Sequence, residues 1–229
     1  MIEYVVPENI DDRVVAKAAR ILKAGGLVAL PTDTSWALVC SMRSKEGIKR
    51  MRRLSGERDE RRFTLLCSDV SQFGAVCSID NRRFRLIKKL SPGPYVFVLQ
   101  TLHGTDKLLS LRRCELGVRI PDNAVPCAVV DALGAPLYSI TAKRSMARRP
   151  GGGGAPDVGA PEGGGGGVEE PPPIPEDELF EGGWELEDID GLDLILDGGE
   201  DMPLRLSTIL DLTDDEARVI RQGAGVFPL

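Results

Sequence analysis

Residues 27–34 read LVALPTDT, a short apolar run followed at once by a proline, two threonines and an aspartate. The run is long enough for one buried strand, and the helix predicted before it, from Asp11 or Asp12 to about Ala24, ends at the glycine pair 25–26. Polar groups that follow a buried strand lie at the edge of an open sheet, where such sheets bind small ligands. The stretch therefore predicts an α/β fold with a ligand site after this strand.

The rest of the chain continues the alternation of helices and strands. Helical periodicity predicts helices over 44–54, 81–90 and 125–133. Apolar or alternating runs predict strands over 63–67, 95–100, 117–120, 137–142, 192–196, 207–212 and 218–220. Short strands and helices in this order favour one α/β domain, in which a twisted mixed sheet is flanked by helices.

Composition changes abruptly at Pro150. Residues 151–175 are almost entirely glycine, proline and acidic residues, with nothing to bury, so 150–175 is predicted to be a disordered insertion. The single domain then comprises 1–149 and 176–229. Residues 176–190 are acidic with interleaved apolar side chains, which predicts a short amphipathic segment that docks on the body of the domain.

The charge is divided unevenly between the two parts of the chain. Residues 1–150 carry 26 Lys/Arg and 15 Asp/Glu, whereas residues 151–229 carry 3 and 20, and the formal net charge is −6. Any one basic cluster is most simply a solvated helix face. Because several recur in the same half, contact with a polyanion is also predicted.

Several bulk features exclude other classes of protein. No apolar run approaches the roughly 20 residues that span a bilayer, and the N-terminus lacks a basic and apolar leader, so a soluble cytoplasmic protein without a membrane partner is expected. The five cysteines are scattered singly, which predicts reduced thiols buried in the core and neither a disulfide nor a metal site. The oligomeric state stays open.

The predicted strand ends share one kind of chemistry. Hydroxyl groups follow the predicted strand at 27–30, lie within the one at 137–142 and begin the one at 207–212. Guanidinium groups belong to the strand at 117–120 and follow the strand at 218–220. Such groups position and stabilise charge, whereas proton transfer needs a paired acid and base. For each residue alone a turn or a cap is the simpler interpretation. Their convergence is the hypothesis, and it predicts a site for attack on the α-phosphate of a nucleotide, with no catalytic acid or base assigned.

Four ordered motifs resemble one known family. Residues 27–34, the SPGPY run at 91–95, the GVRIPD run at 117–122, and the STILD run at 207–211 with Arg221-Gln222-Gly223 are similar to those of the YrdC-like threonylcarbamoyl-adenylate synthases. The resemblance covers nearly everything except the insertion. It implies a twisted mixed sheet around a central, positively charged cavity. It also implies condensation of L-threonine, bicarbonate and ATP to threonylcarbamoyl-AMP and pyrophosphate with Mg²⁺, for the N6-threonylcarbamoyladenosine of tRNA.

The resemblance assigns roles to residues at matching positions. It implies that threonine is held by Thr32, Thr34, Arg119 and Thr141. It implies that Thr141, Ser207 and Arg221 address the nucleotide. Ser139, Arg52 and Lys143 complete the set of candidate nucleotide-binding residues, with Arg52 and Lys143 as clamps for its phosphates.

Two motifs depart from the family pattern. The usual Lys-x-Arg becomes Arg50-Met51-Arg52, and the usual Ser-x-Asn becomes Thr141-Ala142-Lys143. These changes resemble the YciO branch, which shares the fold. Two hypotheses follow: an ATP-dependent synthase, and a binding protein for double-stranded RNA or tRNA whose cavity has drifted from synthase chemistry.

Overall fold

The computed structural model describes residues 1–55, 63–104, 114–147 and 173–227. Nearly all of the predicted insertion lies outside these described residues, so the prediction of disorder there stays a prediction. Within the described residues, none of the helices has the length and apolar character needed to cross a bilayer.

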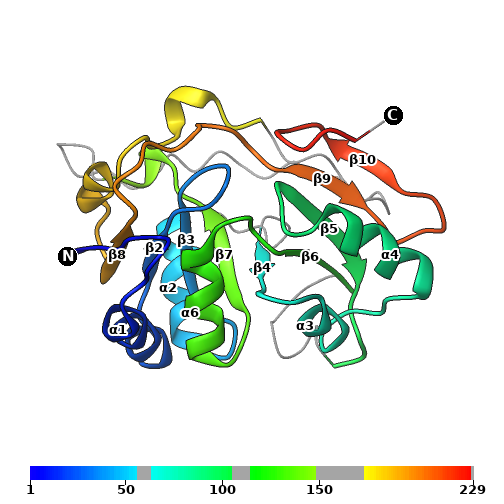
Figure 1. Cartoon of the computed structure of the whole chain (residues 1–229), viewed down its shortest axis with the longest axis horizontal. Coiled ribbons are helices and arrows are strands. Elements are labelled where there is room, and N and C mark those ends of the chain that lie inside the picture. The colour runs from blue at the N-terminus through cyan, green and yellow to red at the C-terminus, as the bar shows by residue number, and fades with distance from the viewer. Residues whose placement is uncertain (56–62, 105–113, 148–172, 228–229) are drawn as a thin grey trace.

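One mixed sheet runs through the described part of the chain (Figure 1). Its ten strands lie in the order β1-β8-β2-β3-β7-β4-β6-β5-β9-β10. Neighbouring strands are parallel in the pairs β1–β8, β2–β8, β4–β6 and β5–β9, and the other neighbours are antiparallel. The strands are β1 Ile2–Tyr4, β2 Val28–Leu30, β3 Ala37–Ser41, β4 Thr64–Leu66, β5 Tyr95–Gln100, β6 Glu115–Arg119, β7 Leu137–Thr141, β8 Leu194–Asp197, β9 Thr208–Asp211 and β10 Arg218–Arg221.

The helices start at the polar caps that the sequence offers. The side chains of Asp11, Asp69, Asp80 and Asn123 each accept a hydrogen bond from a backbone amide in the first turn of the helix that follows. These helices are α1 Asp12–Lys23, α3 Val70–Gly74, α4 Asn81–Leu90 and α6 Ala124–Leu133, and α2 is Lys45–Ser55. Among the described residues, three 3₁₀ turns complete the order: η2 Arg144–Met146, η3 Glu176–Glu178 and η4 Gly183–Asp188.

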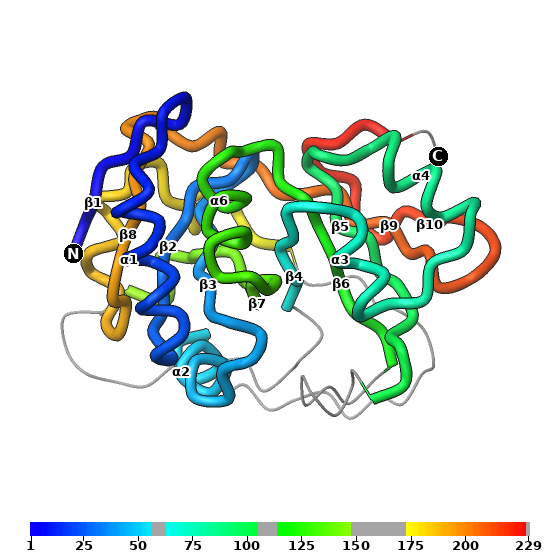
Figure 2. Tube along the Cα trace, turned by 60° about the horizontal axis from the view of Figure 1, so that its bottom comes forward, coloured from blue at the N-terminus to red at the C-terminus, as the bar shows by residue number. Residues whose placement is uncertain are grey.

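The two faces of the sheet bury separate cores. Helices α1 and α6 lie side by side over one face, where they pack on β2, β3 and β7 (Figures 1 and 2). The larger core covers the other face and includes the buried side of α2 and the aromatic residues Phe63, Phe97 and Tyr138. The prediction of a single α/β domain with a twisted mixed sheet flanked by helices is confirmed.

The sequence analysis missed three elements and erred on the exposure of some residues. It did not predict β1, β3 or α3. The prediction that all five cysteines are buried is wrong: Cys40, Cys67 and Cys77 are buried, Cys127 is half-buried, and Cys114 is exposed just before β6. The acidic segment at 176–190 does dock on the domain, but Trp184 points outward and is 70% exposed.

Candidate functional site

The loop between β2 and β3 is closed by the hydroxyl of Thr32. This hydroxyl donates to the carbonyl oxygen of Ser35 over 2.7 Å and accepts from the backbone amides of Thr34 and Ser35. The Thr32 and Thr34 hydroxyls also lie 3.1 Å apart. Since the hydrogen of Thr32 is used within the loop, Thr34 is the donor of that pair, and its oxygen remains an acceptor.

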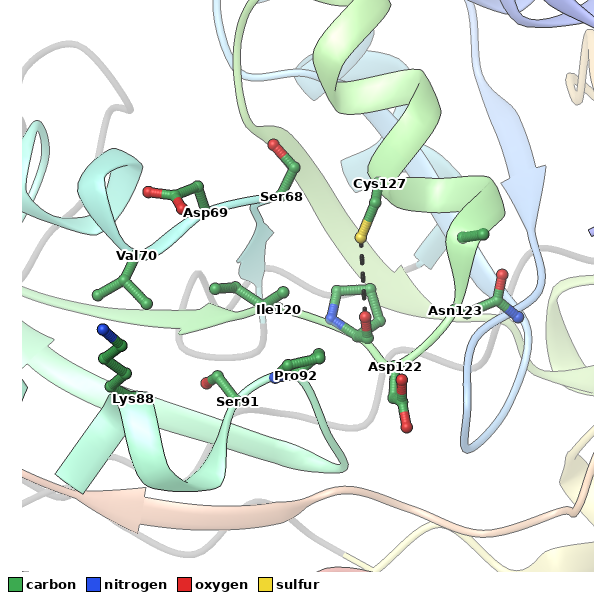
Figure 3. A pocket seen from close by; sticks show the side chains of 12 residues that line it. Ser68, Asp69, Val70, Lys88, Ser91, Pro92, Ile120, Asp122, Asn123 and Cys127 are labelled. Carbon is green, nitrogen blue, oxygen red and sulfur yellow. Dashed lines mark hydrogen bonds between the residues drawn. The ribbon is translucent and has the colours of Figure 1, made fainter. Parts of the chain in front are cut away.

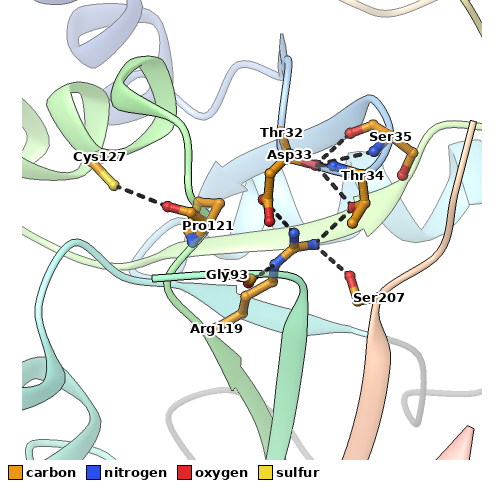
Figure 4. A network of polar contacts seen from close by, with 9 residues as sticks. All are labelled: Thr32, Asp33, Thr34, Ser35, Gly93, Arg119, Pro121, Cys127 and Ser207. Atoms are coloured by element: carbon orange, nitrogen blue, oxygen red, sulfur yellow. Dashed lines mark hydrogen bonds and ion pairs between the residues drawn. The ribbon is translucent and has the colours of Figure 1, made fainter. Parts of the chain in front are cut away.

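Arg119 reaches this loop from the last position of β6 and lies at the centre of a polar network (Figure 4). One terminal nitrogen donates to the Thr34 hydroxyl over 3.1 Å, and the other donates to an Asp33 carboxylate oxygen over 2.5 Å. Its Nε donates to the carbonyl oxygen of Gly93. A further contact, to Ser207, is described next. With it, four segments that are far apart in the sequence meet at this guanidinium: the loop after β2, the turn at Gly93, the end of β6 and the start of the C-terminal strands.

Ser207 joins the C-terminal strands to the same network. Its hydroxyl accepts from Arg119 over 2.5 Å, and its backbone carbonyl accepts two hydrogen bonds from the guanidinium of Arg221, over 2.9 and 3.2 Å. Ser207 directly precedes β9, and Arg221 ends β10, which pairs with β9. Thus Thr34, Arg119, Ser207 and Arg221 form one connected set.

The network is buried, and its charges are nearly balanced. The side chains of Arg119 and Asp33 are 6% and 14% exposed. Burial lowers the pKa of Arg119, and the Asp33 carboxylate opposes that fall, so the guanidinium keeps its proton at physiological pH. The second carboxylate oxygen of Asp33 is buried without a hydrogen-bond partner in the described structure. A buried carboxylate oxygen without a donor is costly, and a ligand ammonium would satisfy it.

Thr141 and Ser139 lie in β7 and are not among the residues that Arg119 hydrogen-bonds. Thr141 pairs with Ala37, three residues after Thr34 in the chain, so it lies at the same end of the sheet as the Thr32–Ser35 loop. Ser139 is buried, and its hydroxyl donates to the carbonyl oxygen of Thr64 over 2.8 Å. Its hydrogen is therefore used within the sheet.

The structure does not bring Arg52 and Lys143 into the Arg119 network by any contact between described residues. Arg52 belongs to the last turn of α2, where its positive charge acts on the buried thiol of Cys40. Lys143 directly precedes η2 and follows the buried Ala142, whose amide donates to the carbonyl oxygen of Trp36. Their predicted contact with nucleotide phosphates stays a prediction.

A pocket of about 520 Å³ lies next to the Arg119 network, between α3, the end of α4 and the start of α6 (Figure 3). Ile120, Pro121 and Asp122 line it, so it begins one residue beyond Arg119. Cys127 also lines it, and its thiol donates to the carbonyl oxygen of Pro121 over 3.7 Å. None of the predicted site residues lines this pocket, which therefore differs from the cavity that the sequence analysis places at the predicted site.

Sequence reasoning assigned no role to two parts of the network. Asp33 stands between the two predicted threonines, but only the fold makes it the ion-pair partner of Arg119. The Gly93 carbonyl is a backbone group, so no side-chain pattern points to it. The signal that could have identified Asp33 was its charge: it is an acidic residue in a stretch predicted to share a site with the guanidinium of Arg119.

Comparison with known proteins places this chain in a family. The Sua5–YciO–YrdC family model, described as "Telomere recombination", matches residues 20–150. The chain belongs to this family. The uncharacterized protein YciO of Escherichia coli K12 is 31% identical over 227 residues, covering 97% of this chain and 95% of YciO. The threonylcarbamoyl-AMP synthase of Mus musculus is 31% identical over 124 residues, covering 54% of this chain and 44% of the synthase.

Solved structures agree with this assignment. The crystal structure of E. coli YciO matches with a TM-score of 0.76 at 30% identity, over 99% of this chain and 97% of that one. P. abyssi Sua5 in complex with L-threonine matches with a TM-score of 0.75 at 21% identity, over 97% of this chain and 57% of that one. At that identity the second match supports the fold alone.

Proposed function

We propose that this protein is an ATP-dependent L-threonylcarbamoyl-AMP synthase that acts in N6-threonylcarbamoyladenosine formation in tRNA. The observation that carries the proposal is the set of unused polar groups around Arg119. In the described structure, Arg119 uses four donor contacts, which leaves one N–H of the nitrogen that binds Asp33. The Ser207 hydroxyl accepts from Arg119 and keeps its own hydrogen, and Asp33 keeps one free oxygen.

These unused groups match the head group of an α-amino acid. A carboxylate can accept from the remaining N–H of Arg119, and the hydrogen of the Ser207 hydroxyl stays available to a nucleotide phosphate. The α-ammonium can donate to the free oxygen of Asp33. The remaining acceptor capacity of Thr34 suits a ligand hydroxyl, which threonine has. L-Threonine is bound in the crystal structure of P. abyssi Sua5, which shares this fold.

The reaction then consists of two steps. The amine of threonine and bicarbonate form a carbamate with loss of water, and a carbamate oxygen attacks the α-phosphate of ATP with release of pyrophosphate. In this proposal Arg119, Thr34 and Thr141 hold threonine and Thr32 fixes the loop that presents Thr34, while Ser139, Thr141, Ser207, Arg221, Arg52 and Lys143 address the nucleotide. We assign no catalytic acid or base, since oriented donors and charge stabilisation accelerate attack on a phosphate.

Magnesium enters this reaction with its substrate. Within the described ranges, no three His, Cys, Asp or Glu side chains gather in a group that could hold a metal ion. Mg²⁺ commonly stays bound to nucleotide phosphates and water, with few protein ligands. In this proposal Mg²⁺ therefore enters the site bound to the ATP phosphates.

Pyrophosphate release tests the proposal. Release that requires threonine, bicarbonate and Mg·ATP together, with threonylcarbamoyl-AMP found by mass spectrometry, is the expected result. The variant Arg119→Met should abolish product, and Arg82→Met, at an exposed cation of α4, serves as the matched control that keeps it. Absence of product from a folded wild-type preparation would refute the synthase.

A second candidate function is binding of double-stranded RNA or tRNA, and the outer face of α4 favours it. Arg82, Arg85, Lys88 and Lys89 are exposed there, and Phe84 between them is 42% exposed. Exposed cations around an aromatic ring suit phosphates and a stacked base. Binding should weaken with salt, and replacing Arg82, Arg85 and Lys89 by glutamine should lower the slope of log affinity against log salt by about 2–3. An unchanged slope would exclude this face.

A further inference from the structure

The only tryptophan side chain on the described surface stands in an acidic region. Trp184 is 70% exposed, whereas Trp36, the other tryptophan of the chain, is 1% exposed. Residues 173–202 contain twelve acidic residues and no lysine or arginine. Seven of the twelve are exposed and have carboxylates without a partner among the described residues: Glu176, Asp177, Glu181, Glu187, Asp188, Glu200 and Asp201.

The turn that carries Trp184 is held rigidly. A carboxylate oxygen of Glu185 accepts from the backbone amides of Glu181 and Gly182, each over 3.2 Å, and the other oxygen pairs with Arg144. The carbonyl of Glu181 accepts from the Trp36 indole over 3.2 Å. Leu186 is fully buried in the core beneath the turn. The exposure of Trp184 therefore results from fixed geometry and not from a loose loop.

The indole lies back against the glycine that precedes the turn. A Cβ built on Gly182 would lie 2.5 Å from the indole Nε1, so the absence of a side chain there lets the ring rest on the backbone. The ring is supported on that side and open to solvent on the other. A large aromatic side chain on a rigid support is typical of the residues that dominate binding at protein interfaces.

A second exposed aromatic residue extends this surface. Tyr4, at the end of β1, is 72% exposed and pairs in register with Asp197. Asp197 in turn lies against Gly183, because a Cβ on that glycine would lie 2.4 Å from a carboxylate oxygen of Asp197. Asp197 thus connects the strand that carries Tyr4 to the turn that carries Trp184, and β1 and η4 lie at the same end of the molecule (Figures 1 and 2).

We propose that Trp184, Tyr4 and the surrounding exposed carboxylates form a docking surface for an arginine-rich segment of a partner protein. A guanidinium stacks on the open indole face by cation–π attraction, and its neighbours pair with carboxylates such as Glu187 and Asp188. The same carboxylates repel nucleic acid. This surface and the basic face of α4 would therefore bind partners of opposite charge. The inference does not depend on the synthase proposal.

Calorimetry with a nona-arginine peptide tests the surface on the full chain. The wild type should bind it, and Trp184→Ala should weaken the affinity about 5-fold or more, as expected for a partly desolvated cation–π contact. Gly182→Ala, which displaces the indole without removing it, should weaken binding in the same direction. Phe84→Ala, at the exposed aromatic of α4, is the matched control and should bind like the wild type. Bound peptide should also protect tryptophan fluorescence from acrylamide, since Trp36 is already buried.

Two results would overturn the proposal. If the wild type and Trp184→Ala bind the peptide with equal affinity, the peptide is held only by non-specific attraction between its positive charges and the acidic residues, and Trp184 takes no part. Self-association in sedimentation velocity that Trp184→Ala abolishes, without peptide binding, would identify the occupant as a second copy of this chain. Because neither readout involves threonine or ATP, failure here is distinguishable from failure of the synthase proposal.

Discussion

Arg119 and Asp33 form an ion pair of 2.5 Å in which both side chains are largely withdrawn from water. Such a pair contributes less to stability than its short distance suggests, because both ions lose their hydration. Removing one partner has a large effect, since the other charge is then buried alone. The pair joins the loop after β2 to the end of β6, so the site and the middle of the sheet depend on the same contact.

Replacing Asp33 by asparagine should therefore destabilise the protein strongly. Asp33→Asn keeps the shape but leaves the guanidinium of Arg119 without its counter-charge, so the free energy of unfolding in urea should fall by about 3–5 kcal/mol. Asp214→Asn is the control, because Asp214 pairs with Arg218 on the surface, where both are 64% exposed, and should cost less than about 1 kcal/mol. Equal losses in the two variants would contradict the role of burial.

Loss of the Thr34 hydroxyl should affect threonine use more than folding. Thr34→Val removes one acceptor of Arg119 and should cost about 1–3 kcal/mol of stability. If threonine binds as proposed, kcat/KM for threonine should fall 10-fold or more while KM for ATP changes little. The control is Thr213→Val, because the hydroxyl of Thr213 donates to the Asp211 carboxylate at the end of β9 and takes no part in the Arg119 network. A fall confined to ATP would place Thr34 in the nucleotide subsite.

The buried thiols should make the protein sensitive to alkali. Burial raises the pKa of Cys40 and Cys77 to about 12, and burial together with Asp131, Asp33 and Asp122 raises the pKa of Cys127 to about 11. A thiol in the unfolded chain ionises near pH 8.5. The free energy of unfolding is therefore unaffected by these thiols below about pH 8.5. Above that pH it falls by about 1.4 kcal/mol per pH unit for each thiol, until the pH reaches the pKa of that thiol in the folded protein.

Urea unfolding between pH 7.5 and 10.5 measures this loss. The slope of unfolding free energy against pH should be less steep in Cys77→Ala than in the wild type, whatever the effect of the substitution on absolute stability. Cys114→Ser, at the exposed cysteine, should keep the wild-type slope. An unchanged slope in Cys77→Ala would mean that this thiol does not govern the alkaline loss.

Arg144 should control how firmly the acidic segment is docked. Its guanidinium pairs with Glu185, donates to the carbonyl of Leu179 over 3.1 Å and lies 5.1 Å from the centre of the Phe180 ring. Arg144→Met should raise amide hydrogen exchange of Leu186 and Ile189 about 10-fold or more, because local opening becomes easier. Lys49→Met, at an exposed cation of α2, should leave that exchange unchanged. Equal exchange in both variants would show that the core contacts alone hold the segment.

Most helices and strands were predictable because local patterns specify them. α1 and α4 follow aspartate caps and apolar periodicity, and β5 has the bounds that its apolar run predicts. β3 was missed because its five residues are all buried and follow a loop that reads as a binding motif. β1 was missed because a three-residue edge strand carries almost no pattern of its own.

The sequence by itself determined the order of elements, the caps of the helices and the hydroxyl and guanidinium groups at the strand ends, because each depends on residues close together in the chain. Only the tertiary structure decided which of these groups meet. Arg119 contacts Asp33, Thr34, Gly93 and Ser207 across separations of 26 to 88 residues. Such contacts depend on strand order and register, which long-range packing sets, so the same fold that unites these residues leaves Thr141 on β7 and Trp184 in the solvent.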